Sequence, residues 1–341
     1  MQFALDPEII DFAGSIDSLL AKSDMPAVIR AWADGDTAPG TAVWGRVAET
    51  GAAALLVDEA AGGAGATAVE AVVALEVLGR HAVPGPVVET VMVAPRIAAA
   101  LGGDSDAGDV AGEIAGGALA SVAAPGVSPF APDPHVAQYL WAVSDDEVFT
   151  AEAGETRRSV DRARTVATPT AGARAAAVST TDLVNHGALG TAAQLQGLGQ
   201  AMLTTSVDYA KQRKQYGKLI GEYQALKHQL AEVAIALEMA RPLLWAGALA
   251  IAENPGDPGA AVRDVSAARV AVADAAYLSA RTALQVHGAI GYTLEHDLGL
   301  WLTKTRALQT AWGTQSYHRG RVLDSLRAGS AAPADAAGAA R

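Results

Sequence analysis

Apolar residues recur with the period of an α-helix over two long stretches in the second half of this chain. The two sets are Leu226, Leu230, Val233, Leu237 and Ala240, then Val265, Ala268, Val272, Ala275 and Leu278. This spacing places each set on one helix face. Half of all residues are apolar and small residues are abundant, so helix axes can approach closely. The sequence therefore predicts a bundle of packed helices in its second half.

Helices are also expected in the first hundred residues. Asp6-Pro7 offers an N-cap followed by proline at the first helical position. Thr67-Ala-Val-Glu70 has the spacing of a capping box. The run Gly62-Gly-Ala-Gly65 is not followed by the Gly-Lys-Ser/Thr of a phosphate loop, so a turn is predicted there.

The middle of the chain differs, because Pro, Gly and Asp separate short segments of strand-like composition near 136–150 and 173–178. The expected fold is mainly α with a small β middle domain. Its predicted parts are an N-terminal helical domain (1–115), a shortened β middle domain (116–185), a C-terminal helical bundle (186–328) and a disordered tail (329–341).

Charge and composition exclude several classes of function. The net charge is −12 without a basic cluster, which argues against binding to nucleic acid. Cysteine is absent, so disulfides and thiolate metal sites are excluded, and no metal site is predicted. No signal peptide is recognised, and the longest strongly apolar stretch, 242–252, is too short to span a bilayer. We expect a soluble cytoplasmic protein that does not bind a membrane.

Two motifs combine charge, amide and glycine. The first, Tyr209-Ala-Lys-Gln-Arg213-Lys-Gln-Tyr216-Gly217 with Gln224 beyond it, contains a glycine suited to a sharp turn. Arg213, just before that turn, could fork onto phosphate oxygens, or could simply complement a helix dipole as a surface arginine. The second motif, Gln285-Val-His-Gly288-Ala-Ile-Gly-Tyr292, suits close approach of a ligand to the backbone, or a helix C-cap and turn.

Together these motifs resemble the Arg-x-Gln-Phe-Gly…Phe-Gln and Gln-x-x-Gly-Gly-x-Gly-Tyr signatures of the acyl-CoA dehydrogenase family. Residues 44–79 are similar to the N-terminal helical domain of that family. The resemblance implies FAD as cofactor and desaturation of an acyl-CoA thioester at the α,β position. It also implies a helical domain, a β-barrel-like middle domain and a four-helix bundle, usually assembled as a tetramer. An electron-transfer flavoprotein is the usual electron acceptor.

The resemblance also assigns roles to five residues. Arg213 would hold the pyrophosphate of the FAD of a neighbouring subunit, with Tyr216 and Gln224 packed beside it. Gln285 and Gly288 would contact the same dinucleotide.

The chain departs from the family at both positions that carry the catalytic base. The usual glutamate precedes a Gly-Thr pair, and Trp312 stands there, before Gly313-Thr314. A minority of members place the base on an earlier helix, where this chain has Gly187. Neither residue can accept a proton. His186 lies next to Gly187 and could act as a base, but a structural or surface histidine is favoured.

The flavin-contacting Thr-Glu-Pro…Gly-Ser-Asp segment of the family corresponds here to residues 122–127, without its polar residues. The tryptophan-bearing strand that covers the flavin has only a weak counterpart at 139–142. Since each flavin is shared across an interface, a subunit can lose its own pocket and still complete that of its partner. We therefore hypothesise a degenerate subunit of a hetero-oligomer with a catalytic acyl-CoA dehydrogenase chain. Bacterial heterotetramers of this kind act on steroid-CoA thioesters.

Three alternatives remain open from the sequence. One is a self-sufficient homo-oligomeric dehydrogenase with a displaced base such as Glu238 or Glu295. Another is a flavin monooxygenase of the same fold, which needs no base but needs a well-formed flavin pocket. The third is a scaffold without enzymatic activity, against which Arg213 and Gln285 count.

Overall fold

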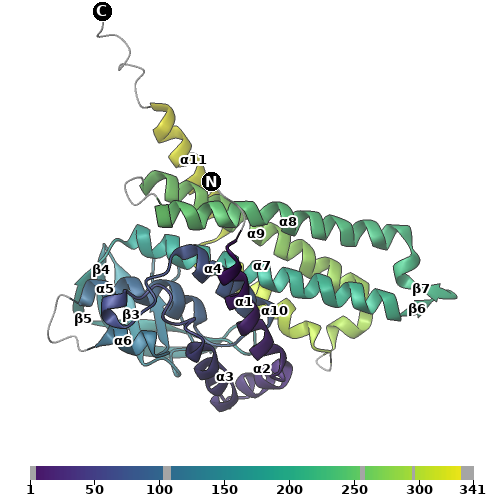
Figure 1. Ribbon diagram of the computed structural model, residues 1–341, viewed down its shortest axis with the longest axis horizontal. Coiled ribbons are helices and arrows are strands. Elements are labelled where there is room, and N and C mark those ends of the chain that lie inside the picture. Colours follow the sequence, from purple (N-terminus) through teal and green to yellow (C-terminus); the bar gives the residue numbers. More distant parts are fainter. Residues whose placement is uncertain (1–4, 103–108, 254–257, 294–295, 332–341) are drawn as a thin grey trace, which may run out of the picture.

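The computed structural model describes residues 5–102, 109–253, 258–293 and 296–331, and it is mostly helical. Figure 1 shows a small sheet beside the N-terminal helices at one end and long helices that extend away from them. The first part contains α1 (Pro7–Ala21), α2 (Met25–Ala33), α3 (Ala38–Glu49), α4 (Ala68–Arg80), the π-helix η2 (Glu89–Val93), α5 (Ala94–Leu101) and α6 (Val110–Ala115).

Local signals set the start of two of these helices as predicted. Helix α1 begins at Pro7, directly after Asp6. At α4, the backbone N–H of Thr67 donates to Oε2 of Glu70 at 2.9 Å, and the hydroxyl of Thr67 accepts from the N–H of Val69 at 3.2 Å. The predicted capping box is therefore formed, and it satisfies backbone donors that a helix start leaves free.

The sheet contains five strands in the order β1-β3-β4-β5-β2. The strands are β1 (Ala120–Ala123), β2 (Ala131–Pro132), β3 (Tyr139–Ser144), β4 (Glu147–Arg158) and β5 (Thr165–Ala177). Only β1 and β3 pair in parallel; the other pairs are antiparallel. Most side chains of β4 and β5 are exposed, so these two long strands are held chiefly by their mutual ladder. That explains why apolar patterning predicted shorter strands.

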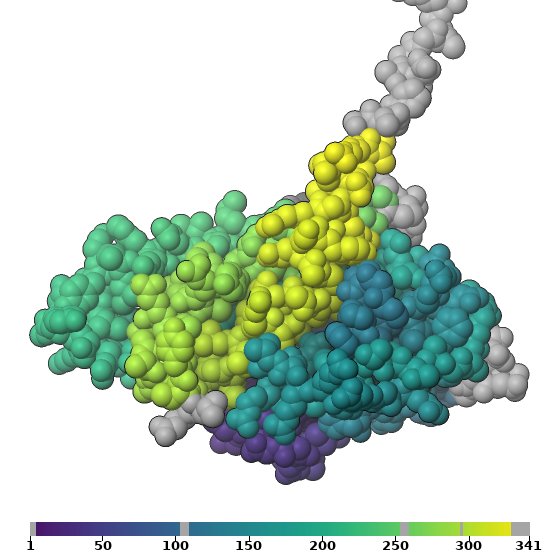
Figure 2. All heavy atoms as spheres, turned by 180° about the vertical axis from the view of Figure 1, so that it is seen from behind, coloured from purple at the N-terminus to yellow at the C-terminus, as the bar shows by residue number. Residues whose placement is uncertain are grey.

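The last part consists of α7 (Thr180–Gln212), α8 (Gln224–Glu253), α9 (Pro258–His287), the 3₁₀-helix η4 (Gly288–Tyr292), α10 (Leu298–Leu308) and α11 (Gln315–Ala331). Figure 2, seen from behind, shows α11 crossing between the bundle and the sheet region. Helix α7 begins at Thr180, six residues before the predicted bundle boundary, and α11 continues to Ala331, inside the predicted tail. The rest of that tail lies outside the described residues.

Close backbone contact joins α4 to α7 at two glycines. A Cβ on Gly79 would overlap the carbonyl of Gln194, and a Cβ on Gly197 would overlap the carbonyl of Glu76. Small residues at these points let the two helices touch backbone to backbone, as the abundance of small residues suggested. This contact fixes α7 against the N-terminal part.

Helix α8 is longer than the apolar stretch 242–252 that it contains. Among the described helices it is the one that is long and apolar enough to cross a membrane, by length and composition alone. A core helix of a soluble protein can pass the same test. It packs against α9, α7 and α4. Ile235, Met239 and Leu243 follow one another at four-residue spacing and are 62%, 70% and 41% exposed. We call these three residues the α8 stripe.

Candidate functional site

The first motif forms the tip of a hairpin between α7 and α8. Strands β6 (Lys214–Gln215) and β7 (Lys218–Leu219) pair there. Tyr216 and Gly217 between them have φ angles of 52° and 83°, which matches a two-residue turn with two left-handed positions. The glycine therefore permits a sharp turn, as predicted, although within a β-hairpin.

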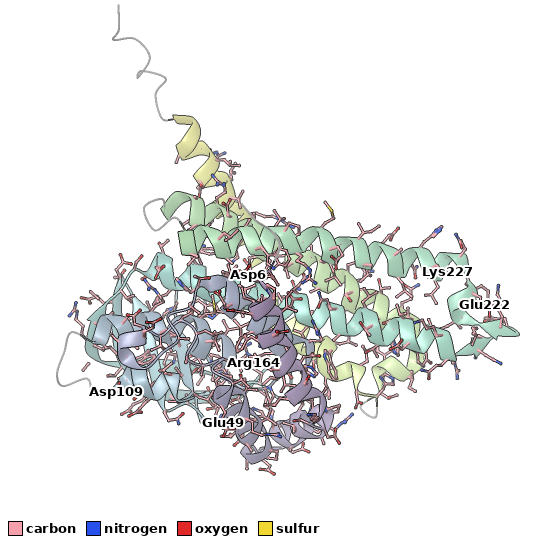
Figure 3. The ribbon with its side chains drawn as sticks, viewed as in Figure 1. Asp6, Glu49, Asp109, Arg164, Glu222 and Lys227 are labelled. Atoms are coloured by element: carbon pink, nitrogen blue, oxygen red, sulfur yellow. The ribbon has the colours of Figure 1, made fainter. Side chains whose placement is uncertain are left out.

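Tyr216 and Arg213 reach into solvent at this tip. Tyr216 is 93% exposed. Arg213 is exposed, and within the described part of the chain its guanidinium has no hydrogen bond or ion pair. Gln224 opens α8, and its Nε2 lies 2.9 Å from Nε2 of His228. Figure 3 shows this end of the molecule through the labels on Glu222 and Lys227. An arginine that binds nothing within its own chain is available to an external anion.

The second motif lies at the same end of the bundle. Helix α9 ends at His287, and Gly288 follows with a φ of 60°. The rings of Tyr209, from the first motif, and His287 stack with centroids 4.4 Å apart. The structure thus brings the two motifs together, as their assignment to one ligand requires.

An open groove of about 640 Å3 adjoins the second motif. Gln285 and Gly288 line it, together with Tyr292 and with Gln229 and Glu232 of α8. Arg281, one helical turn before Gln285, also lines it and was not identified from the sequence. Arg213, Tyr216 and Gln224 do not line this groove: Tyr216 lies in the hairpin turn, Arg213 directly before the hairpin and Gln224 at the start of α8.

The two base positions of the family meet in the interior. The indole of Trp312 packs on the backbone of Gly187, where an added Cβ would overlap the ring. Trp312 is fully buried, with a φ of 51°. Its Nε1 donates to Oε1 of Glu89 at 2.9 Å, and its carbonyl lies 2.8 Å from Nε2 of His318. An indole therefore occupies the place where a carboxylate would act.

One buried arginine and one buried histidine hold the segment that leads into Trp312. Arg269 is fully buried and its Nη2 donates to the carbonyls of Leu308, Gln309 and Ala311 at 2.8–3.2 Å. Burial lowers the pKa of Arg269 to about 10 and the pKa of His318 to about 3. A neutral His318 donates from Nε2–H to the Trp312 carbonyl, so the turn is fixed from both sides.

Glu89 is the carboxylate nearest to this site, and the sequence analysis missed it. It lies on the π-helix η2, where it is the one charged residue of the stretch 86–93, and it is 5% exposed. A single charge within a mainly apolar stretch is the signal that could have identified it. Burial raises the pKa of Glu89. The carboxylate borders a closed cavity of about 10 Å3, which has no room for an acyl thioester.

Two of the other candidate bases, His186 and Glu238, are not placed for chemistry. His186 is buried, and its Nδ1 lies 2.9 Å from the carbonyl of Asp182 and 3.3 Å from its carboxylate, which is a structural role. The side chain of Glu238 is 70% exposed and lies 3.8 Å from Arg241. Glu295 lies outside the described residues. Within the described part of the chain no group of side chains could hold a metal ion.

Two parts of the middle region that correspond to flavin-contacting segments of the family are largely buried. Residues 122–124 are buried, and Ala124 is bridged to Ser128 by backbone hydrogen bonds. Trp141, on the strand proposed to cover the flavin, is 3% exposed and stacks on Tyr139 at 5.2 Å. Both residues therefore pack within the chain.

Comparisons with known proteins agree with these observations. Residues 7–104 match the acyl-CoA dehydrogenase N-terminal domain, and residues 176–326 match the C-terminal domain. Acyl-CoA dehydrogenase IpdE2 of Mycobacterium tuberculosis is 31% identical over 301 residues, covering 85% of this chain and 88% of the relative. The chain belongs to the acyl-CoA dehydrogenase family. The cofactor of this family is FAD.

Solved structures of acyl-CoA dehydrogenases share the fold. The Tcur3481-Tcur3483 steroid acyl-CoA dehydrogenase G363A variant has a TM-score of 0.80 at 21% identity, covering 95% of this chain and 99% of that chain. The ChsE4-ChsE5 complex of Mycobacterium tuberculosis has a TM-score of 0.80 at 21% identity, covering 98% and 100%. The expected fold is thereby confirmed.

The residues present fit FAD at the outer end of the bundle but not in the interior around Trp312. The interior side is filled by Trp312 and by side chains packed within the chain. The outer side offers the groove with Gln285 and Gly288 and the unpaired guanidinium of Arg213. The roles assigned to these residues therefore remain predictions for a flavin that another chain would hold.

Proposed function

We propose that this chain is the flavin-completing subunit of a hetero-oligomeric acyl-CoA dehydrogenase and has no base of its own. The packing of Trp312 on Gly187 carries this proposal, because it fills both positions from which the family removes the α-proton. An indole cannot act as a base at these positions. The chain would therefore depend on a partner for chemistry.

The exposed end of the bundle would contribute binding. The net charge of the chain is −12, but four positive side chains lie in or just before the hairpin: Lys211, Arg213, Lys214 and Lys218. A planar guanidinium can bind two phosphate oxygens at once, so Arg213 suits the pyrophosphate of a partner's FAD. The side-chain amide of Gln285 would donate or accept a hydrogen bond to the same FAD. FAD, when bound in the partner, supplies the acceptor for the β-hydride of the acyl thioester.

Apolar surface supports assembly with a second chain. The α8 stripe is an exposed apolar row on a bundle helix, and such surfaces mark protein interfaces when they form patches. Two of the solved structures that share the fold are named as pairs of chains, and one of them is named as a steroid acyl-CoA dehydrogenase. We infer a cytoplasmic complex with a catalytic subunit, acting on a steroid-type acyl-CoA and passing electrons to an electron-transfer flavoprotein.

Flavin stoichiometry tests this proposal. The chain is purified alone and after coexpression with a candidate catalytic subunit, and bound flavin is measured by absorbance and mass. We expect a colourless lone chain and a complex with half as many flavins as chains, active on an acyl-CoA. A lone chain with one flavin of its own that desaturates an acyl-CoA would overturn the proposal and revive the displaced base.

Two further readouts separate the remaining alternatives. Oxygen-dependent NADH consumption by the lone chain with an added flavin reductase would identify a monooxygenase instead. An Arg213→Ala complex with unchanged flavin content and activity would identify a scaffold.

A further inference from the structure

The closed cavity beside Glu89 is bordered by charged groups from every part of the fold. Glu89 comes from η2, Asp133 and Arg164 from the β region, and Lys304 from α10. Figure 3 shows Arg164 near the middle of the molecule. Gln194 of α7 also lines the cavity. Two carboxyl groups and two cationic side chains therefore meet where the three parts of the chain join.

The walls of the cavity satisfy these groups only in part. Trp312 donates to Oε1 of Glu89, and the backbone N–H and hydroxyl of Thr165 donate to Oδ1 of Asp133 at 2.8 and 3.0 Å. Lys304 donates to the carbonyl of Val83 at 2.8 Å. Within the described part of the chain, both hydrogen bonds to the Asp133 side chain go to Oδ1, and none goes to Oδ2.

Gln194 gives an independent sign that something else is bound there. Its side chain is 2% exposed, and its Nε2 is buried without a hydrogen-bond partner among the described residues. A buried amide left unpaired destabilises the folded state. Such a group is normally satisfied by protein or by ordered water.

We propose that one ordered water molecule occupies this cavity, accepting from the Gln194 amide and donating to the carboxyl groups of Glu89 and Asp133, which line the same cavity. The cavity of about 10 Å3 is close to the smallest space that holds one water. Buried waters typically make about three hydrogen bonds, which these groups supply.

Other occupants fit less well. A divalent metal ion takes about six oxygen ligands, and here two cationic side chains border the same small space. A substrate acyl group needs a pocket of at least about 300 Å3. This proposal does not depend on whether the chain has the partner proposed above.

A crystal structure of the chain, or of the complex that contains it, tests the proposal at a resolution that shows ordered waters. We expect one peak within about 3.2 Å of the Gln194 amide and of at least one of the two carboxylates. No peak, or a peak with about six oxygen contacts near 2.3 Å, would overturn it.

A variant pair makes the test specific. Gln194→Met removes the amide but keeps a side chain of similar length, so the peak should be lost or lose occupancy. Gln196→Met is the matched control on the same helix, because Nε2 of Gln196 donates to the carbonyl of Leu237 at 3.0 Å and Gln196 does not line the cavity. A peak unchanged in Gln194→Met would count against the proposal. If that variant does not fold, the wild-type map decides alone.

Discussion

The indole of Trp312 lies directly on the backbone of Gly187, and the fit is complementary: the ring fills the space that a side chain at 187 would need. The family resemblance predicts that one of these two positions carries the base. Trp312 leaves no room for a carboxylate side chain at position 187, and position 312 itself has no carboxylate.

Gly187→Ala should therefore destabilise the chain, because the added methyl group overlaps the indole. Overpacking of this kind costs about 1–3 kcal/mol, which thermal unfolding measures. Gly14→Ala is the control, since Gly14 is exposed in α1 with nothing near its Cβ position. That control should stabilise the chain by about 0.5–1 kcal/mol. Equal effects of the two substitutions would contradict the contact with Trp312.

Glu89→Gln should change how stability depends on pH. Because burial raises the pKa of Glu89 above its ordinary 4.5, the folded chain holds a proton that the unfolded chain releases. That contribution to stability is lost as pH rises from 4.5 through the raised pKa. The glutamine variant imitates the protonated acid, so it should match the wild type near pH 4.5 and exceed its melting temperature at pH 8 by about 2 °C or more.

Glu49→Gln, at an exposed site, is the control for this comparison. Its melting temperature should differ from that of the wild type by the same amount at both pH values. A Glu89→Gln variant less stable than the wild type at pH 8 would mean that the buried carboxylate is stabilising as an anion.

His318→Gln should weaken acid denaturation. The unfolded chain takes up a proton on this histidine below pH 6.5, whereas burial keeps the folded pKa at about 3. Stability is therefore lost as pH falls from 6.5 toward 3, by about 2 kcal/mol between pH 6.5 and 5. Denaturant titrations at pH 6.5 and pH 5 measure the free energy of unfolding. The variant should lose about 2 kcal/mol less than the wild type between these two pH values. His228→Gln, on the exposed face of α8, should keep it.

Arg213→Ala should leave the melting temperature of the lone chain unchanged, since the guanidinium has no partner among the described residues. In the complex, we expect the dissociation constant for FAD to rise about tenfold or more, as for a lost hydrogen bond to a charged group. Fluorescence titration of the flavin-free complex measures it. Arg213→Lys should be intermediate, because ammonium cannot bind two oxygens in a fork. Tight FAD binding in both variants would remove Arg213 from the site.

Tyr216→Asn separates folding from assembly. Asn-Gly suits a turn with two left-handed residues, so the hairpin and the stability of the lone chain should be kept or slightly improved. The variant loses an aromatic ring that is 93% exposed in the isolated chain. We expect weaker association with the catalytic subunit, measured by analytical ultracentrifugation. An unchanged association constant would show that the ring is not at the interface.

The elements that local spacing defines could be predicted from the sequence. The capping box at Thr67 and Glu70, the helix start at Pro7 and the helical stretches of α8 and α9 depend on neighbours a few residues apart. The turn at Gly217 is of the same kind. The family also follows from local motifs, and with it the absence of a carboxylate at Trp312 and Gly187.

Tertiary structure alone decided what fills the interior. Periodicity shows which side of a helix is apolar, but it does not show which helices meet, so the contact of Trp312 with Gly187 could not be derived from it. Glu89, Asp133, Arg164 and Lys304 are isolated charges in the sequence, and only packing brings them around one cavity. The burial of Glu89, Asp133 and Lys304 is tolerable because each has a hydrogen-bond partner on another element. That balance depends on distances in space rather than on order along the chain.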